Sequence, residues 1–327
     1  MPPAADALRT DSAAIRLHWS WWGSTKAVNP AQRNEVAACF AAESRAVTAG
    51  KKLFDTKGED YRRLTGLKTE ITNLWLDTTL PYPEPGVRLI RRSLIPQVDA
   101  RFADYKARFD AAAADFAAGY ERVKQEAKDR LGRLFSEADY PADVRDKFGF
   151  AWDYPNVEPP EYLMNLNPAL YRQEQERVRS RFEQAVAAAE QGFAAELQEL
   201  VTNLAERLRP GPDGQRKVLR DSAVENLREF FTRFKSLNVG SNAELDRVVA
   251  QAEQVLGTAD AATLRTDADA RLNIADRLGQ VGEALAQAVV TPPRRAFRRA
   301  APANPAAEPT PAAELTPTTG HEPEAAA

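Results

Sequence analysis

The stretch IPQVDARFADYKARFDAAAADFAAGYERVKQEAKDRLGRLF, residues 95–135, decides the fold. Its apolar residues recur at intervals of three or four, which is the spacing of one apolar stripe along a helix. A helix of about 40 residues, rising about 1.5 Å per residue, is roughly 60 Å long. A stripe of that length needs a partner to cover it. The apolar positions are Ile95, Val98, Phe102, Tyr105, Phe109, Ala112, Phe116, Tyr120, Val123, Ala127, Leu131 and Leu134.

A second long helix is predicted over residues 168–208, beginning at Pro168, which suits a first helical turn. Its apolar residues follow the same spacing, and its length matches the first helix. Because sequential helices usually pack as neighbours, we expect the two to pair as a long antiparallel, coiled-coil-like hairpin over residues 95–209.

Two short segments alternate large apolar and polar residues, which is typical of strands with one buried face. The first is residues 15–21 and the second is the aromatic segment 148–154. We expect these two strands to pair in one small sheet through aromatic cross-strand contacts. The aromatic side chains of these strands, with Trp22, are interpreted as core; a base-stacking platform is the alternative.

The predicted fold is therefore mainly α with a small β element and further C-terminal helices. Residues 1–94 hold the first strand and helices after a loose start over 1–12, residues 95–209 form the hairpin with the strand at 148–154, and residues 210–290 form a C-terminal helical region. Residues 291–327 hold eight prolines and little apolar bulk. This composition predicts a disordered Pro/Ala-rich tail.

Charge and composition exclude several classes of protein. The formal net charge is −3, from 44 basic and 47 acidic residues, so there is no global attraction to nucleic acid or an anionic membrane. No window has the length of apolar residues that a membrane-spanning helix needs, and no signal peptide is apparent. Cys39 is the single cysteine, which excludes an intramolecular disulfide and fits a reducing compartment. A cytoplasmic protein is the expectation.

No catalytic, cofactor or metal site is predicted from the residue patterns. His18 and His321 are far apart in sequence and have no cysteine near them, so a His/Cys metal site is not expected. Cys39 lies between Ala38 and Phe40 and is expected to be buried. Serine hydrolase, kinase and dinucleotide-binding signatures do not occur.

Two basic clusters are the candidate contacts for nucleic acid or an acidic partner. Arg294, Arg295, Arg298 and Arg299 surround an aromatic residue, and Arg216 and Lys217 precede a helix predicted to begin at Asp221. The other interpretation of the first cluster is a solubilising junction with the acidic tail.

Four motifs, in order along residues 15–256, resemble a family of uncharacterised bacterial and phage proteins, grouped as a domain of unknown function. They are LHWSWWG at 17–23, GKKL at 50–53, KFGF at 147–150 and RDSAVENLR at 220–228. The resemblance implies genes for MoxR-type AAA+ ATPases and von Willebrand A-type proteins as neighbours. It implies no activity and no catalytic residues.

We therefore expect a non-enzymatic scaffold or interaction protein of a bacterial mobile element or phage. Its partner is expected to be a protein, either an AAA+ ATPase or a second copy of the chain. The alternative is a nucleic-acid-binding accessory factor that uses the basic clusters and exposed aromatic residues.

Overall fold

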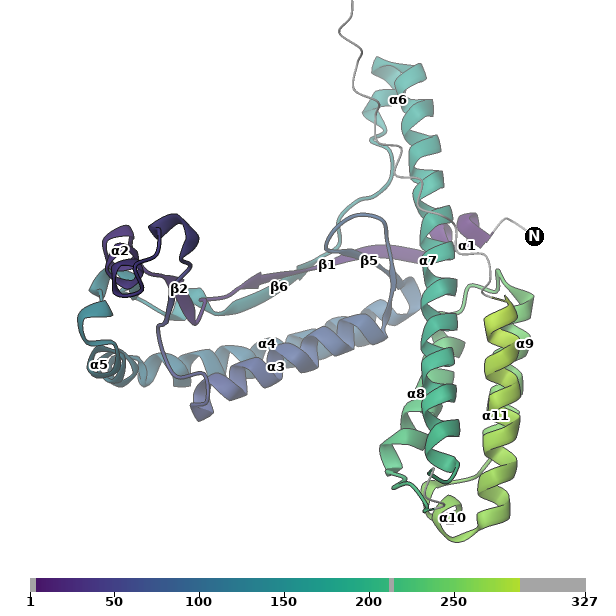
Figure 1. Cartoon of the computed structure of the whole chain (residues 1–327). Coiled ribbons are helices and arrows are strands. Elements are labelled where there is room, and N and C mark those ends of the chain that lie inside the picture. The colour runs from purple at the N-terminus through teal and green to yellow at the C-terminus, as the bar shows by residue number, and fades with distance from the viewer. Residues whose placement is uncertain (1–3, 212–214, 289–327) are drawn as a thin grey trace, which may run out of the picture. The chain divides into compact units, whose positions relative to one another are not determined.

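The apolar stripe of residues 95–135 is helical and mostly buried in the computed structural model, which describes residues 4–211 and 215–288 (Figure 1). The stripe is two helices, α4 (Ile95–Ala118) and α5 (Tyr120–Leu131), which separate at Gly119. Gly132 ends α5 with a φ of 50°, a backbone conformation that favours glycine. Periodicity thus predicted the buried face correctly, while the helix stops short of the full 41-residue stretch.

The partner of α4 is α3 (Glu59–Asp77), so the predicted pairing of residues 95–135 with 168–208 has to be corrected. The two helices run antiparallel, because Arg63 pairs with Asp115 at 2.7 Å near one end of the contact. Arg108 pairs with Glu70 at 3.3 Å nearer the other end. The physical reason is that α3 carries its own apolar stripe, and only short strands separate it from α4. Its buried residues are Tyr61, Leu64, Leu67, Ile71 and Leu74.

The second long helix, α7 (Pro168–Leu208), has the predicted bounds but different neighbours. It packs against α11 (Ala268–Ala288), α1 (Ala4–Asp11) and α8 (Asp221–Leu237). The buried Arg271 of α11 closes the C-terminal end of α7 by donating to the carbonyl oxygens of Leu208, at 2.7 Å, and Arg207, at 2.6 Å. A cation at this position also suits the helix dipole. The predicted coiled-coil-like hairpin is therefore not confirmed.

The described chain also holds four further α-helices, six strands and five short 3₁₀ helices. The remaining α-helices are α2 (Pro30–Cys39), α6 (Tyr162–Leu166), α9 (Ala243–Leu256) and α10 (Ala261–Thr266). The strands are β1 (Ser12–Ser20), β2 (Thr25–Ala27), β3 (Gly50–Lys52), β4 (Thr79–Pro81), β5 (Val87–Arg91) and β6 (Gly149–Asp153).

The predicted pairing of the two alternating strands is confirmed. Strand β1 is the centre of an antiparallel sheet of order β4-β5-β1-β6. In the register of β1 with β6, Leu17 lies opposite Trp152 and Trp19 lies opposite Phe150. The rings of Trp19 and Phe150 are 5.4 Å apart, which is the expected aromatic cross-strand contact. Strands β2 and β3 form a separate antiparallel pair that the sequence did not predict.

The sheet contributes to two hydrophobic cores. Ile15 and Ile90 belong to the core of α3 and α4, whereas the neighbouring Ala14 and Leu89 belong to the core of α7, α8, α9 and α11. Successive strand residues point to opposite faces, so both faces of the sheet near β5 are covered.

The structure is mainly helical with a small antiparallel sheet, as the sequence predicted. The predicted loose start over residues 1–12 is wrong, because residues 4–11 form α1, which buries Leu8 against α7. None of the described helices is long and apolar enough to cross a bilayer. The predicted disordered tail at 291–327 lies outside the described residues.

Candidate functional site

Four of the large exposed apolar side chains of the described residues lie close together in the sequence, on α6 and the start of α7. They are Tyr162, Met164, Leu166 and Leu170, which are 63 %, 53 %, 75 % and 38 % exposed, and we call them the α6 surface. The other large apolar side chains that are exposed in the described chain lie on separate segments. They are Phe40, Leu76, Tyr154, Val218 and Leu272. Exposed apolar side chains that cluster in this way are typical of interaction sites.

The local sequence explains why α6 lies beside α7. Asn167 separates the two helices, and its side-chain oxygen accepts hydrogen bonds from the backbone N–H groups of Ala169 and Leu170, each at 3.1 Å. This is an N-cap for α7, and Pro168 fits the following position. The backbone N–H of Asn167 also donates to the carbonyl oxygen of Leu163 at 2.8 Å, and this hydrogen bond ends α6. The chain thus reverses at Asn167, and α6 contacts α7 (Figure 1).

Charged residues of both signs follow the α6 surface along α7. Glu174 and Arg177 form an ion pair with each other. Arg172 and Glu176 are exposed and have no ion-pair partner among the residues that the structure describes. An apolar centre with a charged rim is the usual composition of a protein–protein contact.

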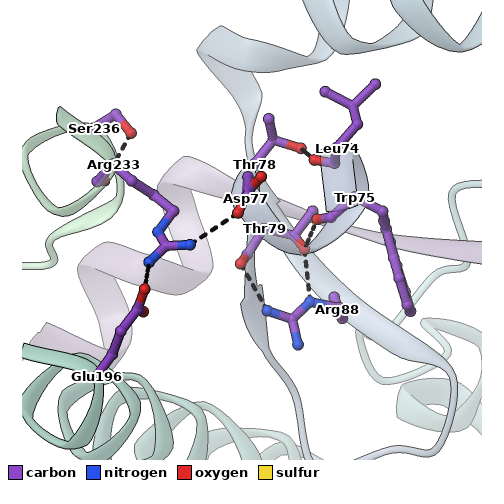
Figure 2. Close-up of polar contacts among 9 residues, drawn as sticks. All are labelled: Leu74, Trp75, Asp77, Thr78, Thr79, Arg88, Glu196, Arg233 and Ser236. Carbon is purple, nitrogen blue, oxygen red and sulfur yellow. Dashed lines mark hydrogen bonds and ion pairs between the residues drawn. The ribbon is translucent and has the colours of Figure 1, made fainter. Parts of the chain in front are cut away.

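A cluster of paired charges lies where α3 ends, near α7 and α8 (Figure 2). The guanidinium of Arg233 on α8 donates to Asp77 at 2.8 Å and also to Glu196 on α7. Burial alone would lower the pKa of Arg233, but the hydrogen bond to Glu196 and the two negative charges raise it instead. Arg233 is therefore a fixed cation that links three helices.

Two hollows adjoin this ion-pair network. The larger, of about 660 Å³, is lined by Asp77, Glu196, Arg233 and neighbouring residues of α8. The smaller, of about 360 Å³, shares Glu196 and Arg233 but has mostly apolar walls and also includes Arg88 of β5. The second hollow is therefore the better candidate for an organic ligand.

The predicted basic clusters are only partly within the described residues. Arg216 and Lys217 are both exposed, and an Arg216 guanidinium nitrogen donates to the backbone oxygen of Arg265 at 3.3 Å. Arg294, Arg295, Arg298 and Arg299 lie outside the described residues. Nucleic-acid binding by these residues stays a prediction.

The aromatic side chains of the two strands pack on or in the core, apart from Tyr154, which is 40 % exposed. Trp21 lies against Phe148 with ring centroids 5.1 Å apart, and Trp22 lies against Phe54 at 4.7 Å. Trp19, Trp21 and Trp22 all pack against the core of α3 and α4. These rings are engaged in packing, which removes the support for a base-stacking platform.

The expectation for Cys39 is wrong, because this cysteine is exposed. Its neighbour Phe40 is also 79 % exposed, so the apolar run that suggested burial faces outward. His18 lies on the sheet beside Arg16 and Asp153, with its ring nitrogen 3.3 Å from the Asp153 carboxylate. In the described parts of the chain, no His, Cys, Asp and Glu side chains gather as a metal site.

Sequence patterns do not reveal the α6 surface, because Pro159 and Pro160 indicate a connector rather than a helix over residues 156–167. One signal is nevertheless present: the run Tyr162–Leu166 is apolar at four of its five positions, although it lies in a connector. No protein-family model, curated protein or solved structure matches the chain.

Proposed function

We propose that this protein is a non-enzymatic scaffold that assembles with copies of itself through the α6 surface. The supporting observation is that four of the large exposed apolar side chains fall within residues 162–170. Leaving such a cluster in water is unfavourable, and burying it in a contact recovers roughly 25 cal/mol for each Å² of apolar area.

A second copy is the occupant favoured by the charges beside this surface. In a twofold contact, the same patch of both copies meets, so residue i of one contacts residue j of the other and the reverse. Charges at the edge of such a contact can pair between the two copies only when the patch carries both signs. Arg172 and Glu176 provide both signs and have no ion-pair partner within the described chain.

Sedimentation equilibrium over a range of concentrations tests this proposal. We expect reversible self-association of the wild-type chain, and weakening by Leu166→Glu of at least roughly tenfold, because a charge would be buried in the contact. Val218→Glu is the matched control, since Val218 is 77 % exposed but isolated from this surface, whereas Leu166 is 75 % exposed. A wild-type chain that stays monomeric, or equal effects of both variants, would contradict the proposal.

The resemblance to phage and bacterial proteins extends the proposal to a setting and a further partner. We propose a cytoplasmic scaffold of a mobile element or phage that also engages an AAA+ ATPase of the MoxR type. A purified ATPase of this type should bind the wild-type scaffold in a surface-immobilised assay. Absence of binding would remove this extension and leave the self-association untouched.

A further inference from the structure

The apolar hollow of about 360 Å³ contains a cation for which the described residues supply no anionic partner. Its walls come from β4, α7 and α8, and they include Leu80, Ala188, Phe193 and Leu237. Arg88 of β5 lines the same hollow. Its volume lies at the lower end of the range for small-molecule sites in proteins, roughly 300–1,000 Å³.

Within residues 4–211 and 215–288, the hydrogen bonds of Arg88 engage only part of its guanidinium (Figure 2). Its Nε donates to the hydroxyl of Thr79 at 2.7 Å, and its Nη2 donates to the backbone oxygen of Thr79 at 2.9 Å. The carbon of the guanidinium is 5.6 Å from the centre of the Trp75 ring, which is within cation–π range. Its third nitrogen carries no dashed line in Figure 2, where the other two nitrogens are both engaged.

Arg88 also has no carboxylate within ion-pair distance in the described part of the chain. Burial lowers the pKa of its guanidinium. A partly buried charge without a counter-ion is costly, and an anionic ligand would relieve that cost.

The neighbouring charges limit what the anion can be. Arg233 is already paired with Asp77 and Glu196, so it is not free to bind a second anionic group. Glu196 lines the hollow as well and would repel a polyanion. A single carboxylate at Arg88, with an apolar chain along the walls, satisfies both constraints.

We infer that this hollow is a binding site for a small monocarboxylate with an apolar chain, held by the free edge of the Arg88 guanidinium. Charge-assisted hydrogen bonds from arginine to carboxylate are among the strongest in proteins. The wall residue Gly192 leaves the hollow open, because a Cβ atom built there meets nothing within 4 Å.

Isothermal titration of the full chain with octanoate tests the inference, with octanol and inorganic phosphate as comparison probes. We expect saturable binding of octanoate with a dissociation constant below about 1 mM, and binding of octanol at least roughly tenfold weaker because it lacks the charge. Phosphate should not bind, because it lacks the apolar chain and carries more negative charge near Glu196.

Two glycine variants separate ligand loss from misfolding. Gly192→Leu should fill the hollow and abolish octanoate binding while removing no existing contact. Gly66→Leu is the matched control, since Gly66 is also an exposed helical glycine with nothing within 4 Å of a built Cβ. Arg88→Gln should weaken octanoate binding at least roughly tenfold and leave octanol binding unchanged.

Three results would overturn the inference. The first is no heat of binding for octanoate up to about 10 mM. The second is equal octanoate binding by the wild type and by Gly192→Leu. The third is octanol binding as tightly as octanoate, which would mean that the Arg88 charge plays no part.

Discussion

Replacing Lys51 by methionine is the sharpest test of how the β2–β3 pair is attached to the helical body. The ammonium of Lys51 lies 2.5 Å from the Asp139 carboxylate and 2.6 Å from the backbone oxygen of Leu134. Only 4 % of the Lys51 side chain and 8 % of the Asp139 side chain are exposed. Lys26, which is 52 % exposed, contacts the other carboxylate oxygen at 2.7 Å.

These contacts determine how much unfolding free energy Lys51→Met should remove. Breaking a buried ion pair by removing one member typically costs about 3–5 kcal/mol, because a buried charge is left uncompensated. Here Asp139 keeps Lys26, so we place the loss for Lys51→Met at the lower end, about 3 kcal/mol. A Lys51→Met, Asp139→Leu double variant should be more stable than Lys51→Met alone, since it leaves no buried charge.

Urea unfolding followed by far-UV circular dichroism measures these differences. Lys52→Met is the matched control, because Lys52 is the next residue of β3 and is exposed. It should change the free energy of unfolding by less than about 0.5 kcal/mol. A loss below about 1 kcal/mol for Lys51→Met, or equal losses for both variants, would refute the reasoning.

Two further predictions concern the hydrophobic core of α3 and α4 and the ion pair of Lys51 with Asp139. Phe109 is fully buried and contacts the rings of Trp19 and Phe150, so Phe109→Ala should cost about 3–5 kcal/mol in urea unfolding; Arg108→Ala on the exposed side of α4 should cost far less. Burial alone would raise the pKa of Asp139, but the hydrogen bonds from Lys26 and Lys51 outweigh it and hold the pKa below its ordinary value. The folded-state pKa is therefore the lower one, and this contribution to stability is present above the unfolded pKa of about 4 and is lost as pH falls through the folded value. Urea midpoints between pH 7 and pH 3 should fall less steeply for Lys51→Met than for the wild type, and parallel curves would contradict this.

The helices could be predicted from the sequence because their apolar spacing is itself the cause of their burial. Val98, Phe102 and Phe109 mark the buried face of α4 in both descriptions. The partner of that face could not be predicted, since a stripe requires burial but does not specify what buries it. The helix α3 satisfies the stripe of α4, which leaves α7 for α11 and α8.

The exposure of Cys39, the hollow at Arg88 and helix α6 could not be predicted from the sequence, each for a different physical reason. Cys39 lies in an apolar run, but both Cys39 and the neighbouring Phe40 are exposed. Local hydrophobicity therefore does not predict whether these side chains are buried. Arg88 is one of three arginines within residues 88–92, and only the tertiary structure shows that it lines an apolar hollow. Helix α6 spans only five residues between proline-containing segments, which is too short for a periodicity argument.

Cross-linking tests most directly whether the α6 surface joins two copies of the chain. Because Cys39 is exposed and is the sole cysteine, a Cys39→Ser background allows one cysteine at a time to be introduced. A short bismaleimide cross-linker should then yield a covalent dimer from Leu166→Cys and little from Val218→Cys, although both positions are about equally exposed. Equal dimer yields from the two positions, or none from Leu166→Cys, would contradict the account.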